Sequence, residues 1–196
     1  MLKHVAFPLI KDLTGPLVFS AEFPNRSFVL TGLSADFNAL SNATGSDEYA
    51  DYLGGTNAMK LVGDGLGANE VVNAITPNTI VYDAINMIRV KLKDVLKTAA
   101  KRWVRITTAN LDDAGSISFN ITDVAVGETG AMYSDASIVA LANDWVQLEV
   151  KFTTGGPDFT GNCRVDMADA DNDGNIDNSG AGNELGIHEL IITTVK

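Results

Sequence analysis

The feature that most constrains this chain is a regular alternation of apolar and polar residues in its second half. It runs through "SISFNIT" (116–122), "DWVQLEVKFT" (144–153) and "RWVRITT" (102–108). The apolar positions of the first two segments are Ile117, Phe119, Ile121, Val146, Leu148, Val150 and Phe152. Because successive side chains of a strand point to opposite faces, this period of two predicts half-buried strands with these apolar residues in the core.

Turn sequences separate these segments at intervals of roughly ten residues. They are "DDAG" (112–115), "GETG" (127–130), "TGGPD" (154–158) and "NDG" (172–174). Short strands at this spacing are typical of an antiparallel sandwich or barrel. With 196 residues, one domain is the better expectation than two.

The rest of the chain is less regular. In residues 86–103 the pattern fits a strand to about Lys93 and then a short helical turn over residues 95–100. Residues 34–57 are polar and are predicted to form a long loop. The apolar segment before them is broken by Pro8 and Pro16, which favours an extended arm over a regular element. We therefore expect an N-terminal arm over residues 1–18 and an all-β domain over residues 19–196.

The charge and hydropathy of the chain exclude two kinds of partner. A net charge of −11 argues against nucleic acid, whose binding depends on Lys and Arg displacing counterions. No segment approaches the roughly 20 apolar residues of a membrane span, and Lys11 and Asp12 interrupt the apolar start before a signal core could form. We expect a protein made in the cytoplasm without a signal peptide.

Basic residues gather in one part of this acidic chain. Seven of its fourteen lie in one stretch: Arg89, Lys91, Lys93, Lys97, Lys101, Arg102 and Arg105. Such a stretch is either a solvated face or a surface that docks onto an acidic partner, such as the acidic half of a neighbouring copy.

The sequence offers little for catalysis. A triad or histidine metal site would need His4 or His188, the only two histidines. The glycines of "GDGLGAN" (63–69) lack the Lys of a phosphate-binding loop. The single cysteine, Cys163, excludes an intrachain disulfide and shares the parity of apolar neighbours, so it is predicted in the core. We expect a non-enzymatic protein that requires no cofactor.

An acidic segment, "DADNDGNIDNSGAGNE" (169–184), follows part of the calcium-loop pattern. Its carboxylates are Asp169, Asp171, Asp173 and Asp177, and Gly174 stands at the sixth position. The twelfth position, where such loops carry a bidentate Glu, is Gly180. Two interpretations stay open: a weak structural calcium site held by the four aspartates, or a solvated acidic loop between two strands.

Both tryptophans, Trp103 and Trp145, stand on the polar parity of their strands. A large ring on a polar face is either covered by a loop or arm, or it forms a contact surface for a sugar or a protein.

From about Gly55 onward, the order of segments resembles carbohydrate-binding-module-like jelly-roll domains found in bacteriophage structural proteins. The matching segments are "GGTNAMKLVGDG" with "YDAINMIRVKLK", then "NDWVQLEVKFTTGG", "CRVDMADADNDG" and the closing "ELGIHELIITTV". The resemblance implies an antiparallel jelly-roll β-sandwich. In the closing strand the family usually carries an Asp pair, where this chain has His188 and Glu189.

Domains of this family either bind glycans or build virions. The resemblance, together with the apolar arm and the absence of a signal, implies a virion structural protein of a tailed bacteriophage. We expect a decoration or cement protein on the capsid exterior, a homotrimer that binds the major capsid protein lattice through the arm and the basic stretch. The alternative is a carbohydrate-binding module that recognises a surface glycan, with Trp103 and Trp145 as contact residues.

Overall fold

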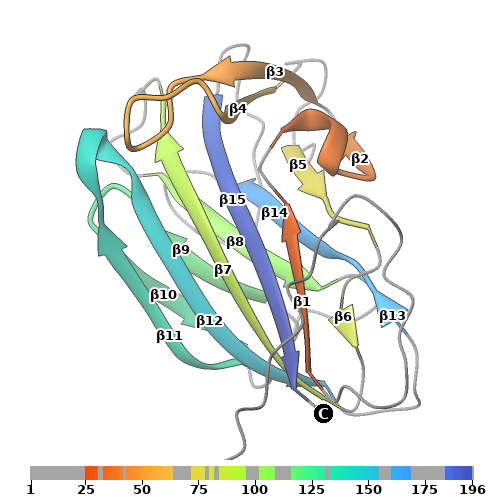
Figure 1. Cartoon of the computed structure of the whole chain (residues 1–196). Coiled ribbons are helices and arrows are strands. Elements are labelled where there is room, and N and C mark those ends of the chain that lie inside the picture. The colour runs from red at the N-terminus through yellow and green to blue at the C-terminus, as the bar shows by residue number, and fades with distance from the viewer. Residues whose placement is uncertain are drawn as a thin grey trace, which may run out of the picture.

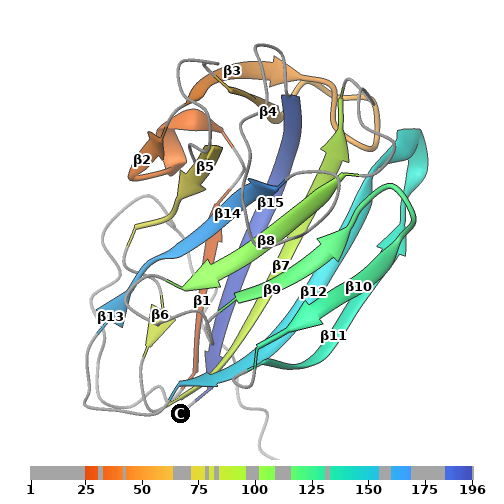
Figure 2. The same cartoon turned by 180° about the vertical axis from the view of Figure 1, so that it is seen from behind.

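The computed structural model describes residues 25–30, 33–41, 43–63, 72–77, 80–81, 84–95, 102–108, 116–130, 133–154, 160–168 and 184–195. These residues form two facing antiparallel sheets, as seen from both sides in Figures 1 and 2. No helix among them is long and apolar enough to cross a membrane. The prediction of an all-β sandwich is confirmed.

The first sheet, sheet A, has the strand order β11-β12-β7-β15-β4-β3, and β1 pairs with β15 beyond the end of β4. Its strands are β1 (Asn25–Leu30), β3 (Ala43–Tyr49), β4 (Ala58–Gly63), β7 (Ala84–Asp94), β11 (Tyr133–Ala140), β12 (Val146–Thr154) and β15 (Glu184–Val195).

The second sheet, sheet B, has the order β10-β9-β8-β14-β5-β2. Its strands are β2 (Ala39–Ser41), β5 (Val72–Ile75), β8 (Trp103–Thr108), β9 (Ser116–Asn120), β10 (Ala125–Thr129) and β14 (Cys163–Ala168). A short ribbon pairs β6 (Ile80–Val81) with β13 (Thr160–Gly161).

The central strands pair as a nested ribbon that is rolled into two sheets. Early strands pair with late ones from the outside inward: β4 with β15, β5 with β14, β7 with β12, and β8 with β9. Members of successive pairs alternate between sheet A and sheet B, which is the jelly-roll arrangement. Strand pairs far apart in sequence thus become the two faces of one core.

The core lies between the sheets and contains the residues that the alternation predicted. Phe119 and Ile121 come from sheet B and the turn that follows it, and Val146, Leu148, Val150 and Phe152 come from β12; all are buried. Cys163 is buried as predicted, and burial raises the pKa of its thiol far above the ordinary value. A neutral buried thiol behaves as a small apolar side chain.

One prediction of secondary structure was wrong. Residues 34–57, expected as a loop, contain a short 3-10 turn η1 (Ser34–Asp36) and the strands β2 and β3. Both strands lie at sheet edges, and most β3 side chains are exposed or half-buried. An edge strand forms backbone hydrogen bonds with one neighbour only and buries few side chains, so its sequence shows no apolar alternation.

The predicted strand to about Lys93 is confirmed, since β7 ends at Asp94. Residues 96–100 of the predicted helical turn lie outside the described residues, as do the predicted arm (1–18) and His4.

Candidate functional site

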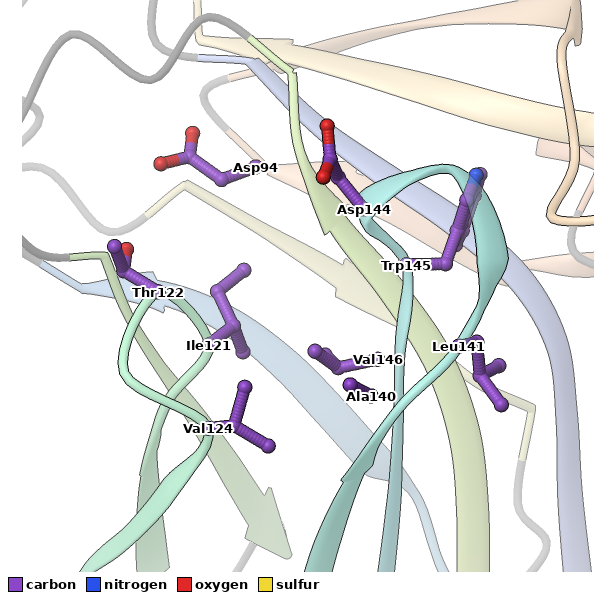
Figure 3. Close-up of a pocket in the computed structure, with 9 residues that line it drawn as sticks. All are labelled: Asp94, Ile121, Thr122, Val124, Ala140, Leu141, Asp144, Trp145 and Val146. Atoms are coloured by element: carbon purple, nitrogen blue, oxygen red, sulfur yellow. The ribbon is translucent and has the colours of Figure 1, made fainter.

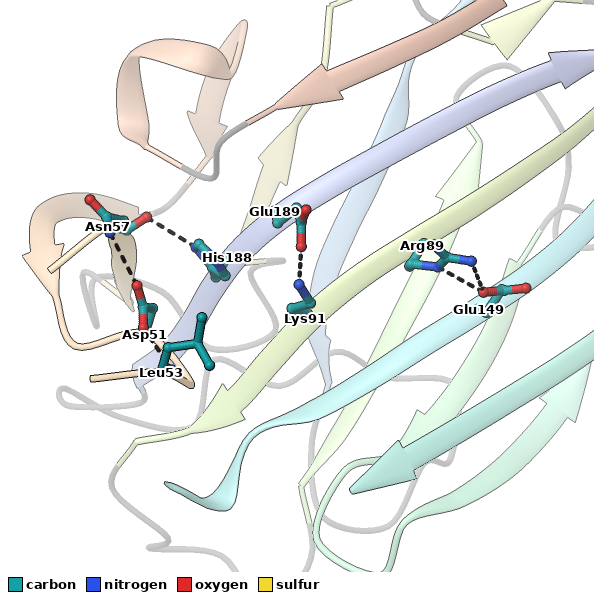
Figure 4. Close-up of polar contacts among 8 residues, drawn as sticks. All are labelled: Asp51, Leu53, Asn57, Arg89, Lys91, Glu149, His188 and Glu189. Atoms are coloured by element: carbon teal, nitrogen blue, oxygen red, sulfur yellow. Dashed lines mark hydrogen bonds and ion pairs between the residues drawn. The ribbon is translucent and has the colours of Figure 1, made fainter. Parts of the chain in front are cut away.

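Polar and aromatic side chains gather on the outer face of sheet A, where Tyr49 at the end of β3 and Tyr52 in the β3–β4 connection lie against side chains of β7 and β15. We call these six residues the outer-face cluster: Tyr49, Tyr52, Lys91, Lys93, His188 and Glu189. They come from the end of β3, the β3–β4 connection (residues 50–57), β7 and β15. Figure 4 shows the Lys91, His188 and Glu189 side chains together with part of the connection.

A bulge in β15 allows two consecutive residues to reach this one face. Neighbouring strand residues normally point to opposite faces. The pairing of β15 with β7 shifts register between His188 and Ile191, and Glu189 has a φ of 47° in the left-handed region. Such bulges redirect side chains. As a result Glu189 pairs with Lys91 while His188 reaches Tyr52 and Trp145.

The β3–β4 connection is organised around the buried carboxylate of Asp51. Oδ1 accepts hydrogen bonds from the backbone N–H groups of Leu53 (2.7 Å) and Gly55 (3.0 Å), and Oδ2 accepts one from the Asn57 amide (3.2 Å). Burial alone would raise the pKa of Asp51. The hydrogen bonds from Leu53, Asn57 and Gly55, helped by His188, outweigh burial and hold this pKa below its ordinary value. The charged carboxylate therefore fixes the connection.

Two further hydrogen bonds tie the connection to its neighbours. His188 Nδ1 lies 3.1 Å from the Asn57 carbonyl oxygen, and Asn143 Nδ2 donates to the Tyr52 carbonyl at 3.0 Å. Because a carbonyl oxygen only accepts, Nδ1 of His188 is the donor in this hydrogen bond. Tyr52 is thus held from β15 and from the β11–β12 turn.

Each of the two lysines in the cluster lies near a tyrosine ring. Lys91 Nζ lies 4.3 Å from the centre of the Tyr52 ring and also pairs with Glu189, although only 8% of Lys91 is exposed. Lys93 Nζ lies 5.9 Å from the centre of the Tyr49 ring. Cation–ring contacts strengthen when the cation is desolvated. Burial, followed by the nearby charge of Glu184, raises the pKa of Tyr49, so its hydroxyl stays protonated at neutral pH.

The structure corrects the prediction that Trp145 forms a contact surface. Its ring lies on the outer face as its parity requires, but only 1% of the residue is exposed. The ring packs edge-on against His188 and next to Tyr49, with centroids 6.2 Å apart in each case. Trp145 therefore supports the cluster from beneath and offers no open face to a ligand.

Trp103 lies on the opposite side of the molecule, on the outer face of sheet B, and is half-buried. Its ring lies across Gly127 of β10: a β-carbon on that glycine would come within 2.3 Å of Trp103 Cζ3. Contact between Trp103 and a ligand stays a prediction.

The residues of the basic stretch differ in burial and in ion pairing. Arg89 Nε and Nη2 lie 2.8 and 2.7 Å from Oε2 of Glu149, and buried Arg102 has its Nε 3.5 Å from Asp94 Oδ1. Arg102 and Lys91 are nearly inaccessible, which corrects their predicted docking role. Lys97 and Lys101 lie outside the described residues. Docking through Lys93, Arg105 and the partly exposed Arg89 stays a prediction.

The four predicted calcium ligands, Asp169, Asp171, Asp173 and Asp177, lie outside the described residues. Within the described part of the chain, no group of three or more His, Cys, Asp or Glu side chains is arranged to hold a metal ion.

The residues of the cluster that sequence reasoning missed are Tyr49, Tyr52, His188 and Glu189. A signal for the first two is present in "YADYLGGTN" (49–57), where an Asp precedes Gly-Gly as in side-chain-capped turns. The β15 bulge has no sequence signal of comparable strength.

No known family model matches this sequence, and no curated protein matches it. Among solved structures, the xylan-binding domain CBM22-1 from Paenibacillus barcinonensis Xyn10C matches 87% of this chain and 94% of its own, at 13% identity and a TM-score of 0.49. Clostridium thermocellum xylanase 10B, with its CBM22-1 and GH10 modules, matches 80% of this chain at 11% identity and a TM-score of 0.45.

Tailspike protein 4 of bacteriophage CBA120 matches 88% of this chain, at 11% identity and a TM-score of 0.41. This chain spans 24% of the Clostridium xylanase chain and 19% of the tailspike chain. At such identities, the function of this chain has to be inferred from its own side chains.

Proposed function

We propose that this chain is a non-catalytic glycan-binding module whose ligand site is the outer-face cluster. The observation that carries the proposal is the arrangement of Lys91, Glu189 and Tyr52, in which a nearly buried ammonium pairs with a partly exposed carboxylate and lies against an aromatic ring. Sugar hydroxyls donate hydrogen bonds, so they match the partly exposed carboxylate of Glu189, which the nearly buried Lys91 ammonium holds in place. The apolar faces of sugar rings match the rings of Tyr49 and Tyr52.

The cluster is also held in place before any ligand arrives. Asp51 fixes the connection that carries Tyr52, Asn143 holds the Tyr52 carbonyl, and Trp145 supports Tyr49 and His188 from beneath. A site organised in advance loses less conformational entropy on binding, which matters for weak ligands such as sugars.

The sheet supplies a matched pair of variants for the test. Glu189 and Glu149 both lie on sheet A and each pairs with a basic residue of β7, but only Glu189 belongs to the cluster. After a glycan array identifies a ligand, calorimetry should show that Glu189→Gln weakens binding about tenfold, a loss of about 1.4 kcal/mol. Glu149→Gln should leave the affinity within about twofold, and Tyr52→Ala should abolish binding.

An array without hits at high protein concentration would overturn the proposal. Equal losses in Glu189→Gln and Glu149→Gln would show that binding occurs elsewhere on the sheet. Unfolding curves of all three variants serve as the control for folding.

Attachment to a virion remains a second candidate. The observation that favours a protein partner is the exposure of Val29 on β1 and Ile85 on β7, at 48% and 40%, on the described surface of sheet A. Apolar side chains of a neighbouring subunit or of an arm could cover them. Deletion of residues 1–16 should abolish binding to capsid particles in a sedimentation assay and leave a folded domain. Normal binding by the truncated protein would exclude the arm as the anchor.

A further inference from the structure

Trp145 borders two features of the molecule. It lines a pocket of about 240 Å3 at one end of the sandwich, which Figure 3 shows. Its ring also lies against Gly186, and a β-carbon on that glycine would lie 3.3 Å from both Tyr49 Cε1 and Lys93 Cβ. The glycine therefore lets Trp145, Tyr49 and Lys93 come together over one point of β15, within the outer-face cluster.

The two lysines of the cluster differ in their partners. Lys91 and Lys93 lie two residues apart on β7 and therefore point to the same face of the sheet. Lys91 is nearly buried and pairs with Glu189. Lys93 is partly exposed, its ammonium lies 5.9 Å from the centre of the Tyr49 ring, and within the described ranges no carboxylate lies at ion-pairing distance from it.

Two acids lie near Tyr49, and neither pairs with Lys93. Glu48 precedes Tyr49 in the chain and is exposed. Glu184 pairs with Lys60, at 3.3 Å between Oε1 and Nζ. Because burial, followed by the charge of Glu184, raises the pKa of Tyr49, the phenol is uncharged at neutral pH and does not repel an anion beside Lys93.

A ligand that covers the Tyr49 ring also removes water from the Lys93 ammonium. An ammonium that loses water without a compensating partner is costly. A sugar hydroxyl offers an uncharged acceptor, whereas a carboxylate or sulfate offers an oppositely charged one, and such a pair strengthens as water is excluded. The net charge of −11 opposes an anion only at long range, because the screening length at physiological ionic strength is about 8 Å.

We propose, on the basis of the glycan site described above, that the ligand of the outer-face cluster is an acidic glycan whose uronate carboxylate or sulfate ester pairs with Lys93. Residues two apart on a strand are separated by about 7 Å. One glycan can therefore contact Lys93 with Tyr49 and, along β7, Lys91 with Tyr52. Glu189 does not oppose this binding, since Lys91 neutralises it.

The first test varies the charge of the ligand. A glycan array with uronate-containing, sulfated and neutral glycans is probed with the full chain. Calorimetry then compares polygalacturonate with its methyl-esterified form, and dextran sulfate with dextran, which distinguishes carboxylate from sulfate. Array hits are expected among acidic glycans and not among their uncharged counterparts. Hits confined to neutral glycans would overturn this inference and leave the proposed glycan site intact, whereas an array without hits would overturn both.

The second test varies the lysine. Lys151 also lies on the outer face of sheet A, where it pairs with Asp135 outside the cluster. Lys93→Gln should weaken binding of the acidic glycan about tenfold, and Lys151→Gln, which removes the same charge, should change it by less than about twofold. Lys93→Arg should retain binding, because a guanidinium also pairs with carboxylate and sulfate.

Thermal melts of the three lysine variants serve as the control for folding. Equal losses in Lys93→Gln and Lys151→Gln would overturn the assignment, because they would show a general effect of charge. Loss of binding in Tyr52→Ala without loss in Lys93→Gln would also overturn it, while the proposed glycan site would stand.

Discussion

The two tryptophans lie on opposite outer faces of the sandwich, and they differ in how deeply they are buried. Each ring lies across a glycine on the outer face of a sheet: Trp145 across Gly186 of sheet A, and Trp103 across Gly127 of sheet B. A β-carbon on Gly186 would come within 3.0 Å of Trp145, and one on Gly127 within 2.3 Å of Trp103. Yet Trp145 is 1% exposed, whereas Trp103 is only half-buried.

The difference lies in what crosses each face. Over sheet A, Tyr49 and His188 pack against the Trp145 ring, and the β3–β4 connection is tied down next to them. A tryptophan on the polar side of a strand can therefore be either buried or exposed. Its role depends on whether another segment returns to cover it, which is a property of topology rather than of the strand.

The largest expected effect is the difference in unfolding free energy between the Trp145→Ala and Trp103→Ala variants. Trp145→Ala removes a fully buried ring and should lower the free energy of unfolding by about 3–5 kcal/mol. Trp103→Ala removes a half-buried ring and should cost about 1–2 kcal/mol. Urea unfolding of both variants measures the difference. Equal losses would mean that the two rings are buried to the same degree in solution.

This comparison also shows where prediction from the sequence succeeds. Val146, Leu148, Val150 and Phe152 were predicted in the core correctly because β12 is central and covered on its core face, so alternation and burial coincide. The strand β3 was missed because an edge strand with mostly exposed side chains has no apolar period.

The outer-face cluster was missed for a different reason. Tyr52, Lys91 and Glu189 meet only through the pairing of β15 with β7 and through a bulge at Glu189. These pairings join residues about a hundred positions apart, and no local pattern encodes them. The buried ion pair between Asp94 and Arg102 could not be predicted either, because charged residues are expected on the surface.

The second prediction compares the glycines. In Gly186→Ala the new methyl group meets Trp145, Lys93 and Tyr49 in a closed space, and overpacking should cost about 1–3 kcal/mol. In Gly127→Ala the new methyl group would overlap the half-buried Trp103 ring and the hydroxyl of buried Ser118, at 2.3 and 2.5 Å, so both must shift. The expected cost there is also about 1–3 kcal/mol, together with greater quenching of tryptophan fluorescence by acrylamide as the Trp103 ring is displaced. Quenching that rises only in Gly186→Ala would reverse the comparison.

The third prediction uses pH to protonate Asp51 and thereby weaken the β3–β4 connection, which lies next to Trp145. The pKa of Asp51 is lowered in the folded state, so its stabilising contribution is present above the unfolded pKa of about 3.9 and is lost as pH falls through the folded value. Asp51→Asn should cost about 1–2 kcal/mol at neutral pH, and the gap to the parent protein should close in acid. Thermal melts between about pH 2 and 6 measure that gap. A gap that stays constant with pH would show that the Asp51 charge does not hold the connection.

The last and smallest effect concerns Trp103. Ala168, the final residue of β14, pairs with Trp103, and the predicted calcium segment begins at the next residue, Asp169. Without the Glu of the twelfth position, affinity should be weak, with a Kd of about 10⁻⁴–10⁻³ M. At about 1 mM calcium this stabilises the fold by about 0.4–1.4 kcal/mol. Calcium should then alter Trp103 emission while Trp145, beneath its own cover, stays unchanged.

A double variant, Asp169→Ala with Asp171→Ala, should lose both the thermal shift and the change in emission. Magnesium at equal ionic strength distinguishes a calcium site from general screening of the acidic segment, because screening depends on ionic strength and not on the identity of the cation. Equal melting curves in the two metals would exclude calcium.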